Sequence, residues 1–208
     1  MRLILAGLAA TALVVSPALA PAAFAQGVAP AGAYAVDKTH ATIQWQGLHN
    51  GLSWYTARFT AFDIQLNFDP ADVTKSKITA SIDPKSIETD FLKTRPAGST
   101  TDFNNELATG DRWFNAGKFP TITFASTAVT KTGANTGKMT GNLTFLGVTK
   151  PVTLDVTYNG SKSFPAPKKS KVGFRAVGAI NKTAWGMPTG GPIADDIKIE
   201  INAEFEQK

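Results

Sequence analysis

Apolar residues recur at every second position along most of this chain, and this alternation constrains its fold more than any other feature. A period of two places apolar side chains on one face of a strand and polar side chains on the other. In the last such run, Ile197, Ile199, Ile201, Ala203 and Phe205 alternate with lysine, glutamate and asparagine. The pattern predicts strands with one face in water and one face in a core.

Runs of this kind predict eight strands, joined mostly by short connections rich in turn residues. Connections this short favour antiparallel neighbours. The predicted fold class is therefore all-β, as a sandwich or as a closed eight-stranded barrel, and alternation alone does not separate the two. A closed barrel has no exposed edge and can hold one small ligand, whereas a sandwich fills its core. The runs are 43–45, 62–68, 78–82, 122–124, 139–145, 152–158, 172–180 and 197–205.

The stretch from Pro84 to Phe119, between the third and fourth predicted strands, lacks clear alternation. Residues 102–107 are typical of a helix start, with Thr101 or Asp102 as its cap. Trp113 and Phe114 then add large apolar surface. A long insertion in a compact domain is often a lid, and its aromatic residues could equally plug one end of a barrel as core. The two interpretations are compatible.

The N-terminus is typical of a secretory signal peptide, with Arg2, an apolar run over 3–15, and Ala23-Phe24-Ala25 before the predicted cleavage site. We expect a signal peptide over residues 1–25 and a mature domain over 26–208 in the periplasm. Cleavage after Ala20 is an alternative. An uncleaved anchor is disfavoured because the apolar run is shorter than the ~20 residues that span a bilayer.

The sequence has few of the residues and motifs that form catalytic or metal-binding sites. It has no cysteine and two histidines, His40 and His49, with no evident third metal ligand. It has neither a nucleophile elbow nor a phosphate-binding loop. The acidic pair Asp195-Asp196, just before the last strand, is interpreted as a turn and strand cap. We therefore expect no enzyme activity, no metal and no cofactor. A net charge of +5, with scattered basic residues, does not indicate nucleic-acid binding.

The chain is unusual in its number of large aromatic residues. It has 13 phenylalanines and 4 tryptophans, many of them on the alternating faces. If the sheet closes, these residues face inward and could line a cavity for a long apolar molecule. They could also fill the interior completely, and composition alone favours the filled core.

Seven segments form a recognisable series of motifs along the chain: Tyr34–Ala41, His49–Gly51, Phe59–Phe62, Ser86–Thr89, Trp113–Phe124, Gly141–Val152 and Asn181–Met187. Together and in this order they resemble the YceI-like family of exported, lipocalin-like polyisoprenoid-binding proteins. Three departures lie in the insertion and one late loop: Glu106-Leu107 stands where the family often has His-Leu, 91–101 is longer than usual, and Lys182 replaces a common arginine.

The resemblance implies an eight-stranded antiparallel barrel, with a helical insertion between strands 3 and 4, around a long apolar channel. The implied ligand is an isoprenoid quinone or a polyprenyl phosphate, which the protein would carry or store. Trp113 and Phe114 would close or gate one end, and His40, His49 and Lys182 are candidates for contacting the head group at the rim. On this fold, strand parity assigns the channel wall to Phe62, Leu66, Phe124, Leu143, Phe145, Val156, Phe174 and Ile199.

Two alternatives stay open. One is a stress-response or interaction module whose barrel is a filled core. The other is a lipid-modifying enzyme, which would need an acid–base pair inside the cavity, and the wall positions offer none. Because the family has been linked to quinone-using systems, the resemblance also suggests a membrane b-type cytochrome as partner.

Overall fold

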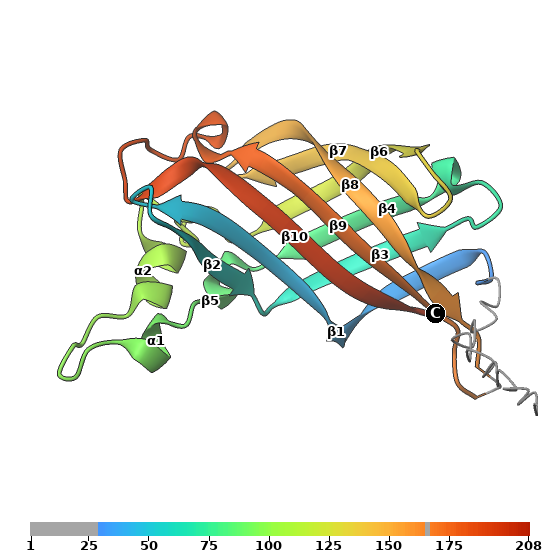
Figure 1. Cartoon of the computed structure of the whole chain (residues 1–208), viewed down its shortest axis with the longest axis horizontal. Helices are drawn as coiled ribbons and strands as arrows, with labels where there is room; N and C mark the ends of the chain where they lie inside the picture. Colours follow the sequence, from blue (N-terminus) through green and yellow to red (C-terminus); the bar gives the residue numbers. More distant parts are fainter. Residues whose placement is uncertain (1–28, 165–166) are drawn as a thin grey trace, which may run out of the picture.

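The computed structural model describes residues 29–164 and 167–208, so the predicted signal peptide and its cleavage sites lie outside the described residues. The chain forms one antiparallel sheet that curls until β1 pairs with β10 (Figure 1). The strands are β1 (Gly32–His49), β2 (Ser53–Phe59), β3 (Phe62–Phe68), β4 (Lys77–Ile82), β5 (Ile87–Glu88), β6 (Ile122–Lys131), β7 (Thr136–Phe145), β8 (Val148–Lys162), β9 (Lys171–Asn181) and β10 (Ile193–Gln207).

Short helices occupy the connections. Of these, α1 and α2 belong to the insertion between β4 and β6, while η1, η2 and η3 are single 3-10 turns. Among the described helices, none combines the length and the apolar character needed to cross a bilayer. The helices are η1 (Val73–Lys75), η2 (Pro84–Ser86), α1 (Phe91–Thr94), α2 (Phe103–Thr109) and η3 (Lys182–Trp185).

Closure of the sheet confirms the barrel over the sandwich. Strands β1, β3, β4, β6, β7, β8, β9 and β10 form the ring, each antiparallel to its neighbours. The closing ladder pairs Ile43 with Ile201 and Trp45 with Ile199. Both sides of this ladder place their apolar residues in the same register, so closure adds a continuous dry face and leaves no open edge in the ring.

The chain has two strands that alternation did not predict, β2 and β5. Asn50 and Gly51, with φ values of 49° and 71°, reverse the chain after β1. Strand β2 then runs back along the second half of β1, while β3 pairs with its first half. Strand β2 buries only Ala57 and Phe59, both near its end, so the alternating run is too short to be recognised.

The insertion is partly anchored and partly exposed. Helix α2 begins as predicted, with the Asp102 carboxylate accepting a hydrogen bond from the Asn105 backbone N–H. Its Leu107 and Ala108 are buried, whereas the residues of α1 are not. Phe114 is buried and packs edge-on against Phe59, with ring centroids 5.4 Å apart. Figure 1 places α2 at one end of the barrel.

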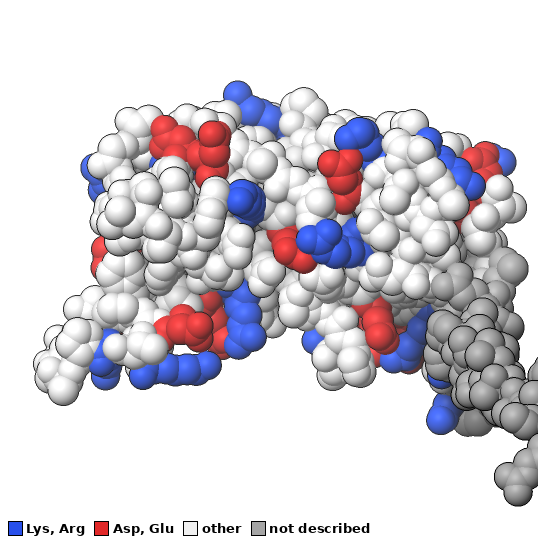
Figure 2. All heavy atoms as spheres, in the orientation of Figure 1, with Lys and Arg blue, Asp and Glu red and all other residues white. Residues whose placement is uncertain are grey.

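The outer face of the barrel is polar, as the alternation predicts. Figure 2 shows basic and acidic side chains interspersed over the face it draws. Exposed ion pairs join neighbouring strands on the outer face of the barrel, such as Arg175 with Glu200 at 2.8 Å and Lys138 with Asp155. Surface pairs of this kind contribute little to stability, so the burial of the inner face is what holds the barrel together.

Candidate functional site: an apolar cavity inside the barrel

The barrel encloses a cavity of about 480 Å³. At one end, here called the helical end, it reaches Phe114, Lys182 and Met187. At the other, here called the hairpin end, it reaches η1 and Asn135 and Thr136 at the β6–β7 turn. Figure 1 shows α2 and the β6–β7 turn at opposite ends of the barrel. Protein interiors hold few voids larger than a water molecule, so a cavity of this size contradicts a filled core.

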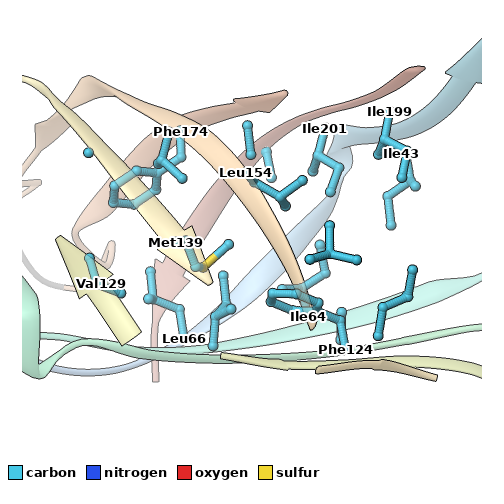
Figure 3. Close-up of a pocket in the computed structure, with 18 of the residues that line it drawn as sticks. Ile43, Ile64, Leu66, Phe124, Val129, Met139, Leu154, Phe174, Ile199 and Ile201 are labelled. Atoms are coloured by element: carbon cyan, nitrogen blue, oxygen red, sulfur yellow. The ribbon is translucent and has the colours of Figure 1, made fainter. Parts of the chain in front are cut away.

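The middle of the cavity is hydrocarbon. In Figure 3, side chains from opposite walls point into one space, and their drawn atoms are carbon apart from the sulfur of Met139. Phe174 sits within an aromatic cluster, with its ring centroid 5.3 Å from that of Tyr158 and 5.6 Å from that of Phe68. Such a surface gains free energy by covering an apolar molecule and offers water few hydrogen bonds.

The structure places all but one of the predicted wall and gate residues in the cavity lining. The exception is Phe62, which is buried in the first position of β3, directly after the chain bends at Thr60 and Ala61. The residues found in the lining are Leu66, Trp113, Phe114, Phe124, Leu143, Phe145, Val156, Phe174 and Ile199.

The three predicted rim residues do not lie together: one lines the cavity and two lie outside its lining. Lys182 lines the cavity at the helical end. His40 and His49 lie outside the lining and nine positions apart on the same strand, β1. His40 is exposed where the pairing of β1 with β10 is irregular, and the His49 ring lies 6.3 Å from that of Tyr55.

Lys182 is a buried cation that the protein itself neutralises. Its residue is 3% exposed, and its Nζ donates to Asp195 Oδ1 at 2.6 Å and to the Pro188 carbonyl at 3.2 Å. This corrects the interpretation of Asp195-Asp196 as a turn and strand cap. Both residues lie within β10, where Asp195 pairs with Lys182 and Asp196 accepts a hydrogen bond from the Asn181 amide at 3.1 Å.

Sequence reasoning missed Trp45 as a residue of the site. It lines the cavity, is 8% exposed, and its Nε1 has no hydrogen-bond partner among the described residues. Its ring centroid lies 6.2 Å from that of Phe114, which places it at the helical end. Strand parity predicts that Trp45 faces inward, and an indole N–H on a dry face is the signal that could have drawn attention to it.

One surface cluster has the residue types of a metal site. Ligand atoms of Asp37, His40 and Glu204 lie within 4.8 Å of one another. The Lys171 ammonium, however, lies 2.6 Å from Asp37 Oδ2 and 3.8 Å from Glu204 Oε2. Its hydrogen bond, followed by those from Thr39 and His40, holds the pKa of Asp37 far below its usual range. Because an ammonium already occupies this position, the cluster does not favour a metal ion.

Charged groups in the lining are few and basic. They are Lys77 and Lys131 toward the hairpin end and Lys182 at the helical end. No aspartate, glutamate or histidine lines the cavity among the residues that the structure describes. The cavity wall therefore lacks the carboxylate or imidazole groups that most often serve as general bases.

Comparison with known proteins gives one consistent result. The profile of the YceI-like domain matches residues 34–205. Protein YceI of Salmonella arizonae is 33% identical over 193 residues, which cover 91% of this chain and 95% of that protein. The crystal structure of BcnA from Burkholderia cenocepacia superposes with a TM-score of 0.67 at 25% identity, covering 81% of this chain and 98% of that one.

A further solved structure shares the fold at lower identity. It is a polyisoprenoid-binding domain from Saccharophagus degradans implicated in plant cell wall breakdown. It superposes with a TM-score of 0.55 at 14% identity, covering 84% of this chain and 98% of that domain. At this identity the likeness is one of fold.

Proposed function

Since the chain belongs to the YceI-like family, we propose that it binds a long isoprenoid lipid inside its barrel, as a carrier or reservoir. The observation that carries the proposal is the hydrocarbon-lined cavity of about 480 Å³. The occurrence of the same fold in a polyisoprenoid-binding domain supports the ligand class.

The energetics of burial agree with this ligand. Moving apolar carbon from water into a dry cavity gains about 0.8 kcal/mol per CH₂ group. Association costs on the order of 4–15 kcal/mol in lost freedom of motion. A few buried isoprene units are needed before binding becomes favourable, so a long chain is a better ligand than a short one.

We also propose that the protein binds its ligand without transforming it. The lining lacks acidic and imidazole side chains among the described residues, which argues against acid–base chemistry on an enclosed lipid. Export to the periplasm and a b-type cytochrome partner are parts of the same proposal. Export rests on the signal peptide expected over residues 1–25, and the cytochrome partner rests on the resemblance stated above.

The deciding experiment compares two alanines of β9. Ala176 lines the cavity and is buried, whereas Ala179 is exposed on the outer face of the same strand. Ala176→Phe fills the cavity with apolar volume, and Ala179→Phe is the matched control. The full chain is expressed in a Gram-negative host, purified gently and extracted with organic solvent, and the bound lipids are identified by mass spectrometry.

We expect a near-stoichiometric isoprenoid with the unmodified protein and with Ala179→Phe, and little or none with Ala176→Phe. An empty extract from the unmodified protein, together with no binding of added isoprenoid quinone, would overturn the proposal. The alternative of an interaction module that binds no lipid would then be favoured.

A further inference from the structure

The cavity meets solvent at its hairpin end. At the helical end the lining residues Phe114, Lys182 and Met187 are buried. The exposed residues of the lining all lie at the hairpin end, where β4 begins and where β6 turns into β7. They are Lys77, Thr130, Lys131, Ala134, Asn135 and Thr136. The hairpin end is therefore the mouth of the cavity.

The pairing of the strands explains why the wall opens here. The ladder between β4 and β6 stops at the pair Thr79 and Ala125. The backbone N–H of Ile78 donates instead to the Ser126 hydroxyl, at 2.9 Å. Beyond this point, over 127–131, β6 continues with β7 as its partner and without β4. The ring of strands thus lacks backbone hydrogen bonds between β4 and β6 beside the mouth.

Lysines that are scattered along the sequence come together around this mouth. Figure 1 shows the connections β3–β4, β6–β7 and β8–β9 at the same end of the barrel. Over 69–77, 131–136 and 162–171, they and the strand ends beside them carry two acidic residues, Asp69 and Asp72. Against these stand seven lysines: Lys75, Lys77, Lys131, Lys162, Lys168, Lys169 and Lys171. At the other end, the insertion over 83–121 mixes five basic with six acidic residues. The connections therefore place their excess positive charge at the mouth.

The fold leaves the lysines nearest the cavity largely uncompensated. Lys77 and Lys131 line the mouth, are exposed, and form no ion pair with the described residues. Lys75 Nζ lies 3.4 Å from Asp72 Oδ2, but both side chains are largely in water, where such a pair is weak. A concentration of charge of one sign attracts a surface of the opposite sign.

We propose that the hairpin end docks on an anionic lipid surface, and that the isoprenoid passes between the bilayer and the cavity through the mouth. This rests on the proposed function and adds to it the place where the ligand enters. Water excludes a long isoprenoid chain, so a carrier takes its ligand from a membrane. Anionic lipids attract lysines that lie close to the bilayer surface, and the lysines around the mouth hold the opening against that surface.

The first test measures how the full chain partitions onto vesicles of phosphatidylcholine, with and without phosphatidylglycerol. The mouth variant combines Lys75→Gln, Lys77→Gln and Lys131→Gln. The matched control combines Lys85→Gln, Lys93→Gln and Lys118→Gln, which alter exposed lysines of the insertion. Both variants lose the same charge, so the comparison separates docking by one end from attraction by net charge.

We expect the chain to bind vesicles that contain phosphatidylglycerol, and to bind them less as the salt concentration rises. Each lysine near an anionic surface raises affinity roughly fivefold. The mouth variant should therefore bind about a hundredfold more weakly than the unmodified chain, and the control variant nearly as well as the unmodified chain. Equal losses in the two variants would mean attraction by net charge and would overturn the inference.

Fluorescent labelling tests which end makes the contact, because the chain has no cysteine of its own. Ala134 in the β6–β7 turn and Ala97 between α1 and α2 are both exposed. An environment-sensitive fluorophore on Ala134→Cys should respond to anionic vesicles, and the same fluorophore on Ala97→Cys should not. The reverse result would place the contact at the exposed Leu52 and Leu92 of the helical end and would contradict the inference.

Binding of a short-chain isoprenoid quinone, measured without vesicles, separates this inference from the proposed function. If the quinone binds but no anionic vesicle does, lipid binding stands, docking is wrong, and the lysines are left for an acidic protein partner. If vesicles do not bind, and a short-chain prenyl phosphate outcompetes the quinone except in the mouth variant, the lysines hold a head group and docking is again wrong. If the quinone does not bind, the proposed function fails and this inference fails with it.

Discussion

At the scale of single residues, Asp37 connects parts of the chain that are far apart in sequence. Its carboxylate accepts hydrogen bonds from Lys171 Nζ at 2.6 Å and from Thr39 Oγ1 at 2.6 Å, and it lies 3.0 Å from His40 Nδ1. Lys171 is 134 positions away, at the start of β9. The cluster pins the irregular part of β1 to β9, across the strand that closes the barrel.

Asp37 should make stability depend on pH in a defined direction. Its pKa is lowered in the folded protein, mainly by the Lys171 hydrogen bond, from about 3.9 in the unfolded chain. Between these two values the unfolded state binds more protons, so stability rises with pH there. The contribution of Asp37 is complete above about pH 5 and is lost as the pH falls toward the native pKa.

We predict that Asp37→Asn lowers the unfolding free energy by about 1.5–3 kcal/mol near neutral pH, the range for a hydrogen bond to a charged group. Urea titrations of both proteins at a series of pH values measure this difference. It should shrink steadily as the pH is lowered below about 4. A difference that stays constant down to the lowest accessible pH would contradict the role assigned to the carboxylate.

Lys182 supports the loop before β10 through its two short contacts. We predict that Lys182→Met costs about 1–3 kcal/mol of unfolding free energy, because the Pro188 carbonyl and Asp195 lose their donor. Asp195→Asn should cost more, about 3–5 kcal/mol, since it leaves the buried Lys182 ammonium without its counter-charge. A double-mutant cycle followed by urea denaturation measures the coupling, and additive single effects would show that the two side chains do not depend on each other.

At the scale of elements, Gly141 lets β7 pass close to a cavity-lining ring of β6. A Cβ placed on Gly141 would overlap the tip of the Phe124 ring and lie 2.6 Å from the Ala125 carbonyl oxygen. The backbone atom cannot move aside without disturbing the β6–β7 ladder, so Gly141→Ala should destabilise the protein by about 1–3 kcal/mol, as overpacking does. Gly117→Ala is the control, because a Cβ there meets no neighbour within 4 Å.

Thermal unfolding of the two variants checks this prediction. A melting temperature that falls for Gly141→Ala and barely changes for Gly117→Ala is the expected result. Equal effects would mean that the ladder yields at Gly141 more easily than its geometry implies.

How well elements can be predicted from sequence depends on how much of each one is buried on one side. Strand β10, with its long alternating run, was predicted directly, and the start of α2 followed from its cap at Asp102. Strand β2 was not, because its inward residues Ala57 and Phe59 form too short a run. The Asn50-Gly51 pair, a strong hairpin signal, could have indicated it.

At the scale of the whole molecule, parity predicts which side chains face inward but not whether they meet. The void depends on the number of strands in the ring and on the summed volume of the inward side chains. Alternation predicts the eight strands of the ring, but it does not show that the sheet closes or how fully the inward side chains fill the interior, so a filled core and a hollow barrel look alike in the sequence. For the same reason parity assigns Phe62 to the wall, although the structure buries it outside the cavity lining.

A hollow barrel should gain stability from its ligand, and a filled one should not. A ligand that binds only the folded state stabilises it by about 2.7 kcal/mol when present at 100 times its dissociation constant. Added isoprenoid should therefore raise the melting temperature of the lipid-free protein and of Ala179→Phe.

In Ala176→Phe the new ring occupies the space and contacts the wall. Cavity-filling replacements commonly add about 0.5–2 kcal/mol of stability, so the lipid-free variant should be at least as stable as the parent. Added isoprenoid should then leave its melting temperature unchanged. Calorimetric scans with and without ligand separate these effects, and a ligand-induced rise in Ala176→Phe equal to that of Ala179→Phe would mean that the lipid binds elsewhere on the barrel.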